Sequence, residues 1–308
     1  MTSAGPLVSI IVPTYNRAWC IERAIKSILS QTYERFELIV VDNNSGDDTV
    51  AKVNSFNDAR TRIVEISNDG IVAKSRNKGI QCSKGKYIAF LDSDDVWHPE
   101  KLQKCVSRLE EGADICFHWM SEIGSKKPMG LTRRLRKPIL HDLIANGNAV
   151  ATSSVVVSRR AFLEIGMFSE DRDLIAIEDY DAWVRLSRIT ERFECIECIL
   201  GGYTLGADGL LGGTESNTRR RLALEGIRDK HYMLHKIVLG YTPGWLLNAL
   251  AKHYLSVNPK TATSYNMECI RSKASLSAKV KASAIQTLVF FYYIRTVATR
   301  AYRLLRGV

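Results

Sequence analysis

Short runs of apolar residues alternate with segments of helical periodicity through the first 120 positions of the chain. The runs are rich in Val, Ile, Leu and Phe, which is typical of strands that are buried on both faces. They cover residues 8–12, 36–41, 61–66, 86–91 and 114–119. Between them, apolar residues recur every three or four positions in 21–29, 71–80 and 99–109, as they do along one helix face. This alternation predicts an α/β domain with a mainly parallel sheet flanked by helices.

The pattern changes after residue 120. A further strand is predicted at 152–157, and an amphipathic helix at 177–189 with Trp183, Leu186 and Ile189 packing inward. Six glycines lie within 201–217, which is the composition of a loop. From residue 218 onward the periodicity is helical throughout.

The charge of the chain is divided at the same place. Residues 219–308 hold 16 Lys and Arg against three acidic residues, whereas residues 1–218 hold 27 basic and 30 acidic residues. A net charge of +10 therefore comes entirely from the last part of the chain. We expect a catalytic α/β domain in 1–218 and a basic helical region in 219–308. The helical region would bind a membrane surface, mediate oligomerisation or bind the acceptor.

Composition restricts the class of protein further. Apolar residues make up 45% and charged residues 25% of the chain, which excludes a disordered or collagen-like protein. Seven dispersed cysteines are too few for a disulfide scaffold and favour a reducing compartment. Because the N-terminal run is short and no stretch reaches ~18 apolar residues, we expect a cytoplasmic protein, soluble or peripheral on the inner face of the membrane.

Polar side chains gather where three predicted strands end, at 13–16, 42–44 and 92–95. In an open parallel sheet, ligands bind beyond the carboxyl ends of the strands. Several carboxylates in LDSDD repel one another unless a cation neutralises them, and their hard oxygen atoms suit Mg²⁺ or Mn²⁺. The alternative is that these aspartates cap a helix and are simply solvated.

Five sequence blocks resemble those of the family 2 glycosyltransferases, in the same order and spacing. The blocks are VSIIVPTYNR (8–17), SILSQTYERFELIVVDNNSGDDT (27–49), AKSRNKGIQCSKGKYIAFLDSDDVWHPEKL (73–102), ATSSVVVSRRAFLEIGMFSE (151–170) and IEDYDAWVRL (177–186). The resemblance covers roughly residues 7–200. It implies the GT-A fold and an inverting, metal-dependent transfer of sugar from a nucleotide-diphospho-sugar, a UDP-sugar in our prediction, to a hydroxyl acceptor. The acceptor would be a glycan or lipid-linked glycan in cell-surface polysaccharide synthesis.

The resemblance also implies roles for individual residues. Asp94 would hold Mn²⁺ or Mg²⁺, and Asp179 would be the general base that takes the proton of the acceptor. Asp95 and Glu178 would support these two groups. The residues expected at the donor are Pro13, Thr14, Tyr15, Arg17, Asp42, Arg76, Asp92 and Ser93. Without the resemblance, the acidic residues at 178–181 could equally complement a helix N-terminus.

One segment departs from the family pattern. Many relatives place a histidine or a Tyr-Arg pair after the last sheet strand, whereas this chain has GGYTLGADGLLGG, with Thr204 after Tyr203. Asp208 is the nearest candidate for a third contact to metal or diphosphate. The glycines favour a loop that orders when donor binds.

Other sequence patterns are weaker evidence for a functional site. Cys195 and Cys198 have the spacing of a metal or redox pair but stand alone in a predicted strand, so we interpret them as structural. His231 and His235 are expected on a solvated helix face. The segment 283–308 places aromatic residues beside four arginines, as in a helix that lies on anionic lipid or packs on a second subunit. These arginines are Arg295, Arg300, Arg303 and Arg306.

Two other functions remain open at this stage. A sugar-phosphate nucleotidyltransferase would share the sheet and the metal but would normally carry a Gly-rich basic loop where this chain has PTYNR. A non-catalytic sugar- or lipid-binding relative is the second alternative, although both acidic sites are retained. Binding to nucleic acid is not expected, because no recognition module is present.

Overall fold

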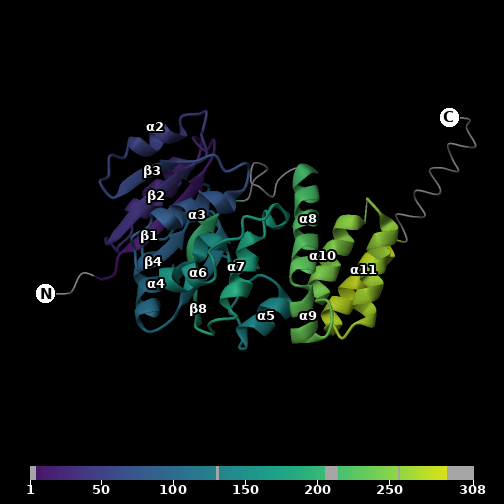
Figure 1. The fold of residues 1–308 in the computed structure, drawn as a ribbon. Helices are drawn as coiled ribbons and strands as arrows, with labels where there is room; N and C mark the ends of the chain where they lie inside the picture. Colours follow the sequence, from purple (N-terminus) through teal and green to yellow (C-terminus); the bar gives the residue numbers. More distant parts are fainter. Residues whose placement is uncertain (1–4, 130–131, 205–213, 256, 290–308) are drawn as a thin grey trace, which may run out of the picture. The chain divides into compact units, whose positions relative to one another are not determined.

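The computed structural model describes residues 5–129, 132–204, 214–255 and 257–289. The chain forms two compact units, each continued by a segment from elsewhere in the sequence. Unit 1 comprises Met1–Leu140 and Asn148–Gly212, and unit 2 comprises His141–Gly147 and Gly213–Val308. The ribbon is drawn in Figure 1.

Unit 1 is built on a sheet whose eight described strands follow the order β3-β2-β1-β4-β7-β6-β8-β5. Strands β3, β2, β1 and β4 lie side by side and are parallel, and β6 and β8 are parallel to each other. Strand β7 runs antiparallel to β4 and β6, and β5 runs antiparallel to β8. The strands are β1 Val8–Thr14, β2 Phe36–Asp42, β3 Thr61–Glu65, β4 Tyr87–Phe90, β5 Val96–Trp97, β6 Ile115–Glu122, β7 Val156–Ser158 and β8 Phe193–Tyr203. The predicted fold class, a mainly parallel α/β sheet flanked by helices, is confirmed.

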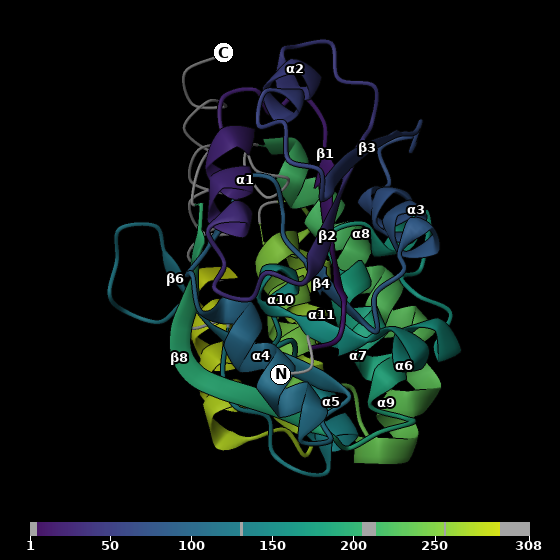
Figure 2. The same cartoon turned by 90° about the vertical axis from the view of Figure 1, so that its left-hand side faces the viewer.

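Helices cover both faces of this sheet, as Figure 2 shows for α1 on one side and α3 on the other. Side chains of α1, α2 and α4 join one core with β1, β2 and β4, whereas α6 and α7 bring aromatic rings against Phe90 and its neighbours on the opposite face. The helices are α1 Ile21–Leu29, α2 Thr49–Asn54, α3 Val72–Cys82, α4 Lys101–Glu110, α6 Arg159–Glu164 and α7 Glu178–Leu186, with 3-10 turns η1 Thr152–Ser154 and η2 Arg172–Leu174.

Alternation along β1 explains this two-sided core. Val8, Ile10 and Val12 are buried in the cluster shared with α1 and α4. Ile11 points the other way, toward α3, where Gly79 leaves room for it. Because both faces are covered, the strand is continuously apolar, which is the pattern that its sequence displays.

Some predicted boundaries were wrong for local reasons. Helix α7 ends at Leu186, so Ile189 is 46% exposed instead of packing inward. Gly201 and Gly202 belong to β8, because their lack of side chains lets Met120 and Val96 approach closely. The strand predicted at 152–157 begins only at Val156, after a 3-10 turn. Asp208 lies outside the described residues.

Unit 2 is helical in its described part. Its helices are α5 Ile139–Asn146, which begins two residues earlier in unit 1, α8 Thr214–Lys230, α9 Tyr232–Leu239, α10 Gly244–Tyr254, α11 Pro259–Arg271 and an unlabelled helix at residues 276–289. Leu247 of α10 and Cys269 of α11 pack with Ala274 and Ala282. The expectation that His231 and His235 face solvent was wrong, since both are buried.

Two sequence expectations bear on membranes and thiols. In the described ranges, no helix combines the length and the apolar character that crossing a bilayer requires. The arginines of the C-terminal segment, at 295, 300, 303 and 306, lie outside the described residues. All seven cysteines are free thiols, including Cys195 and Cys198 in β8.

The packing of α3 on β1 gives a test of the fold. A Cβ at Gly79 would lie 2.6 Å from Ile11 Cγ2 and 3.2 Å from Val41 Cγ2. We expect Gly79→Ala to lower the free energy of unfolding by about 1–3 kcal/mol, because overpacking forces the neighbours to shift. Gly46→Ala is the matched control, since no atom lies within 4 Å of its added Cβ. Urea unfolding measures both, and equal effects would contradict the tight contact.

Candidate active site

The carboxyl ends of β1, β2 and β4 place the predicted donor residues on one edge of the sheet. Thr14 and Asp42 are register partners at the ends of β1 and β2. The Thr14 hydroxyl is buried and has no hydrogen-bond partner among the described residues, and Tyr15 beside it is 54% exposed. Both carboxylate oxygens of Asp42 accept hydrogen bonds from Ser45. The backbone nitrogen of Ser45 donates to Oδ2 at 2.8 Å, and its hydroxyl donates to Oδ1 at 2.5 Å. Asp42 therefore shapes the loop after β2, while Thr14 and Tyr15 offer polar and aromatic contacts to a ligand.

Two arginines lie beside the predicted metal-binding aspartate. Arg23 Nη2 donates to the backbone oxygen of Asp94 at 2.8 Å and to the hydroxyl of Thr204 at 2.9 Å. Arg17 lies near enough that its charge, like that of Arg23, acts to lower the pKa of Asp94. Arg17 was predicted from the sequence, but Arg23 was not, because its position within α1 matches no motif.

The loop after β4 holds three aspartates close together. Burial, followed by the charge of Asp92, raises the pKa of Asp94 above its ordinary value. The pKa of Asp95 is raised well above its ordinary value by the same two causes. Asp95 Oδ1 accepts a hydrogen bond from the backbone nitrogen of Thr204 at 3.1 Å, which fixes the end of β8 against the loop. Ser93 is buried in this loop, and Pro13 is buried in β1, one residue before the strand ends.

These aspartates suit a divalent cation shared with a ligand. Their mutual repulsion is what a bound cation would relieve, and carboxylate oxygens are the ligands that Mg²⁺ and Mn²⁺ prefer. Among the described residues, however, no three acidic, histidine or cysteine side chains converge as a complete metal cage. The site therefore fits a cation held by one or two carboxylates, with phosphate oxygens and water as the other ligands.

Arg76 joins the donor edge to the second acidic group. Its Nη2 lies 2.7 Å from Asp92 Oδ1, and its Nη1 lies 2.5 Å from Glu178 Oε1, on a residue 102 positions away in sequence. The side chain is only 4% exposed and lies over the ring of Phe168. Burial alone would lower the pKa of Arg76, but the two carboxylates together raise it. Arg76 thus binds the protein's own carboxylates, whereas the sequence placed it at the donor.

Asp179 occupies the first turn of α7, next to Glu178. Its Oδ2 accepts hydrogen bonds from Thr152 Oγ1 at 3.1 Å and Asn148 Nδ2 at 3.2 Å, and its Oδ1 accepts one from the backbone nitrogen of Tyr180. Burial, and next the charge of Glu178, raise the pKa of Asp179 to about 7. The charge of Arg76 and the hydrogen bonds oppose this rise. A carboxylate with this pKa can take up a proton near neutral pH.

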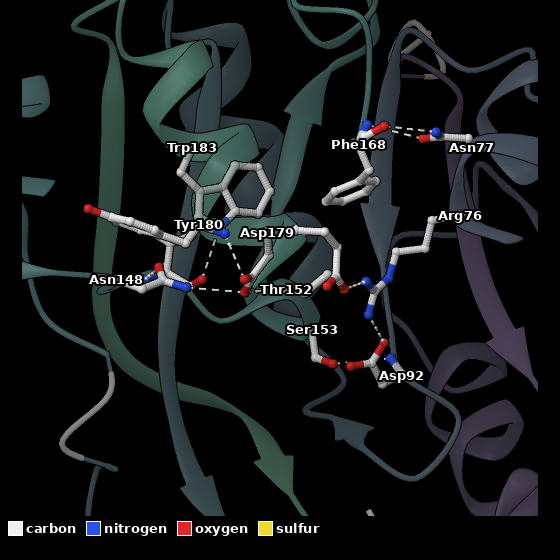
Figure 3. A network of polar contacts seen from close by, with 12 residues as sticks. Arg76, Asn77, Asp92, Asn148, Thr152, Ser153, Phe168, Asp179, Tyr180 and Trp183 are labelled. Carbon is white, nitrogen blue, oxygen red and sulfur yellow. Dashed lines mark hydrogen bonds and ion pairs between the residues drawn. The ribbon is translucent and has the colours of Figure 1, made fainter. Parts of the chain in front are cut away.

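The 3-10 turn after residue 151 connects the two acidic groups. Thr152 donates to Asp179, and the hydroxyl of the next residue, Ser153, accepts from the backbone nitrogen of Asp92 at 3.1 Å (Figure 3). Burial raises the pKa of Tyr203 to about 12, and the next causes are the charges of nearby carboxylates. These carboxylates belong to Asp95, Asp92, Asp94 and Asp179. The acids predicted for the donor side and the acid predicted for the acceptor side therefore lie close together in unit 1.

Several contacts of this site were missed by sequence reasoning. Thr152 and Ser153 lie within a block that matches the family, so that block was the available signal for them. Asn148 precedes the block, and Arg23 and Thr204 bind through contacts that join distant segments. No sequence pattern indicates those three residues.

Comparison with known proteins identifies relatives of the chain. The model of the family described as glycosyl transferase family 2 matches residues 9–166. WfgD of Escherichia coli, named UDP-Glc:alpha-D-GlcNAc-diphosphoundecaprenol beta-1,3-glucosyltransferase, is 29% identical over 243 residues, which are 76% of this chain and 93% of WfgD. An uncharacterized glycosyltransferase of Rickettsia prowazekii is 32% identical over 60% of each chain.

Solved structures share the fold at low sequence identity. Residues 1–349 of Staphylococcus aureus TarS, in complex with UDP-GlcNAc, match with a TM-score of 0.58 and 17% identity over 94% of this chain and 92% of that one. The mannosyltransferase PcManGT from Pyrobaculum calidifontis, in complex with GDP-Man and Mn²⁺, matches with a TM-score of 0.57 and 18% identity over 98% and 85% of the two chains. The fold is the GT-A fold of glycosyltransferases. The chain belongs to glycosyl transferase family 2 and is a glycosyltransferase.

The ion pair between Arg76 and Glu178 predicts that substitutions of these two residues have non-additive effects on stability. We expect Arg76→Met to lower the free energy of unfolding by about 3–5 kcal/mol, because Glu178 is then left buried without its cation. In Arg76→Met/Glu178→Gln the loss should be smaller than the sum of the two single losses, since no uncompensated charge remains at that end of the bridge. Urea unfolding of the four proteins in this cycle gives the coupling energy, and additive losses would contradict a direct ion pair.

Proposed function

We propose that this glycosyltransferase moves a sugar from a UDP-sugar to a hydroxyl of a lipid-linked glycan, with inversion at the anomeric carbon. The observation that carries the proposal is the joining of the donor-side aspartates to Asp179 within unit 1, through Arg76 and the Thr152–Ser153 turn. Family membership favours this function over the nucleotidyltransferase alternative. The retention of both acidic groups favours an active enzyme over a non-catalytic relative.

The donor would lie along the carboxyl ends of β1, β2 and β4. Thr14, Tyr15 and Asp42 would contact the nucleoside, and Arg17 would approach the diphosphate. The UDP assignment is supported by WfgD and by a second Escherichia coli relative, WfaP, 31% identical over 58% of this chain, since both are named for transfer from UDP-Glc. It is also supported by the UDP-GlcNAc bound in TarS. Arg76 would act indirectly, by fixing Asp92 where the ribose is expected.

Asp179 would act as the general base. Its carboxylate accepts the proton of the acceptor hydroxyl while the hydroxyl oxygen forms a bond to the anomeric carbon. The bond from that carbon to the diphosphate oxygen breaks, and the nucleoside diphosphate leaves with the electron pair. One base opposite one leaving group gives inversion. Thr152 and Asn148 hold one oxygen of Asp179 and so fix the orientation of the carboxylate.

Asp94 would hold Mn²⁺ or Mg²⁺, with Asp95 keeping the loop in place through Thr204. A bound divalent cation would supply positive charge next to the diphosphate. PcManGT, which shares the fold, was solved with Mn²⁺ and GDP-Man. Arg23 is fixed to the backbone of Asp94, so it adds a permanent positive charge on the same side of the site.

The acceptor assignment rests on the curated relatives. WfgD and WfaP are named for transfer to alpha-D-GlcNAc-diphosphoundecaprenol, and the match to WfgD spans most of both chains. We therefore infer an acceptor carried by a lipid diphosphate and a role in the synthesis of cell-surface polysaccharide. An enzyme with such an acceptor works at the inner face of the membrane.

Substitutions of Asp179 and of Asp94 should affect different properties of the enzyme, the first the rate of transfer and the second the binding of UDP with metal. We expect Asp179→Asn to lower kcat by about 10²–10⁴-fold while UDP binding is retained, because the base alone is lost. Asp94→Asn should abolish the gain in UDP affinity that Mn²⁺ provides, as measured by calorimetry with and without the metal. Asp69→Asn, at an exposed ion pair with Lys74, is the control that should change neither property. Loss of UDP binding in Asp179→Asn would remove Asp179 from the role of base.

The pH dependence of transfer gives a second test of the base. Because Asp179 must be ionised to accept a proton and its pKa is raised to about 7, kcat/KM should be low in acid and rise with pH through about 7. Thr152→Val removes a hydrogen bond that stabilises the ionised form, so the midpoint should move up by about 0.7 unit. Glu178→Gln removes a negative charge that raises the pKa, so the midpoint should move down.

Ser154→Ala is the control for this profile, because Ser154 lies in the same turn but, among the described residues, its hydroxyl donates to the backbone oxygen of Ala151 and not to Asp179. Its midpoint should equal that of the unmodified enzyme. If neither Thr152→Val nor Glu178→Gln moves the midpoint, the titrating group is not Asp179.

A further inference from the structure

The last described helix, residues 276–289 in unit 2, is apolar on two opposite faces. Ser275 begins the helix by accepting a hydrogen bond from the backbone nitrogen of Ala278. Ala282 and Val289 are buried on the inward face, and Ala282 joins the core that includes Leu247. A surface helix normally needs only this one apolar face, with polar residues opposite.

The outward face carries a second apolar stripe instead. Leu276 is 79% exposed, Val280 61% and Leu288 55%, and Ala284 between them is also exposed. Their spacing of four residues places them in one row along the helix. Exposed single apolar residues are common, but a continuous row of them indicates a surface with a partner.

Positive charge flanks this stripe on both sides. At about 100° per residue, Lys279 and Lys281 fall on opposite margins of the row. Lysines at such margins can extend their ammonium groups while their stems cover apolar surface. From Cys269 to Val308 the sequence contains eight basic residues and no acidic residue. The electrostatic complement of this region is therefore anionic.

We propose that the outward face of residues 276–289 binds an anionic lipid surface. Its apolar row would enter the boundary between head groups and acyl chains, with Lys279 and Lys281 at the level of the phosphates. A second copy of the chain fits less well, because a symmetric contact between two such faces would bring like charges together. The apolar row likewise does not suit a free anion, which has no apolar surface to bury.

This surface deepens the proposed function, on whose lipid-linked acceptor it rests. An acceptor anchored in a bilayer is confined to that surface, so an enzyme bound there meets it at a higher local concentration. Binding to lipid needs neither donor nor acceptor, however, and it can be measured without catalysis.

The test is flotation of the full chain with vesicles in the absence of nucleotide. The protein should float with vesicles of phosphatidylglycerol and phosphatidylcholine, float far less with phosphatidylcholine alone, and lose binding as salt is raised, because salt screens the lysines. Leu276→Glu/Val280→Glu should lower the partition coefficient at least tenfold. Lys279→Glu/Lys281→Glu should also lower it at least tenfold, since each lysine near an anionic surface contributes on the order of fivefold.

Met233→Glu/Ile237→Glu is the matched control. These two residues of α9 are also exposed and four positions apart, at 65% and 76% exposure, but they lie on a different helix of unit 2. This variant should keep the partition coefficient of the unmodified chain within about twofold. Unchanged thermal unfolding midpoints and UDP affinities would show that every variant is folded.

The outcomes are distinct. Absence of flotation with anionic vesicles at low salt, or equal flotation of Leu276→Glu/Val280→Glu and the unmodified chain, overturns the proposal. A change of oligomeric state in that variant without a change in flotation assigns the face to a second copy and also overturns it. If vesicles are bound but no UDP-sugar supports transfer, the lipid surface stands and the proposed function fails.

Discussion

The ion pairs of one buried guanidinium organise the catalytic unit. Arg76 contacts Asp92, which follows β4, and Glu178, which begins α7, so it connects two segments that are far apart in sequence. A buried arginine with two carboxylates keeps its charge, and the cost of burying all three groups is offset only while their geometry is maintained. The pKa of Asp179 depends on the same cluster, because Glu178 raises it and Arg76 lowers it.

Contacts of this kind limit what the sequence alone can predict about the site. The strands, the sheet flanked by helices and the polar strand ends followed from the pattern of apolar and polar residues, which is clearest in β1, β2 and β4 because these strands are almost entirely buried. The five matching blocks then indicated which acids matter. The pairing of Arg76 with Glu178 spans 102 residues and has no local pattern. Its role as a bridge could therefore be found only in three dimensions.

The same limit applies to residues whose environment is set by tertiary packing. His235 was expected on a solvated helix face, yet it is fully buried, and neither ring nitrogen has a hydrogen-bond partner in the described part of the chain. Asp42 ends a strand where a ligand contact is predicted, and each of its carboxylate oxygens also accepts a hydrogen bond from Ser45. In each case the residue type and the strand or helix were evident, but the neighbour that decides its chemistry comes from the fold.

The turn formed by Thr152 and Ser153 has a consequence for how such enzymes can diverge. Two consecutive hydroxyls contact the loop after β4, through the backbone nitrogen of Asp92, and the first turn of α7, through the carboxylate of Asp179. A shift of the backbone in this turn would therefore disturb both acidic groups at once. Substitutions that leave the turn intact, in the loops around it, can change the shape of the site without breaking these two contacts.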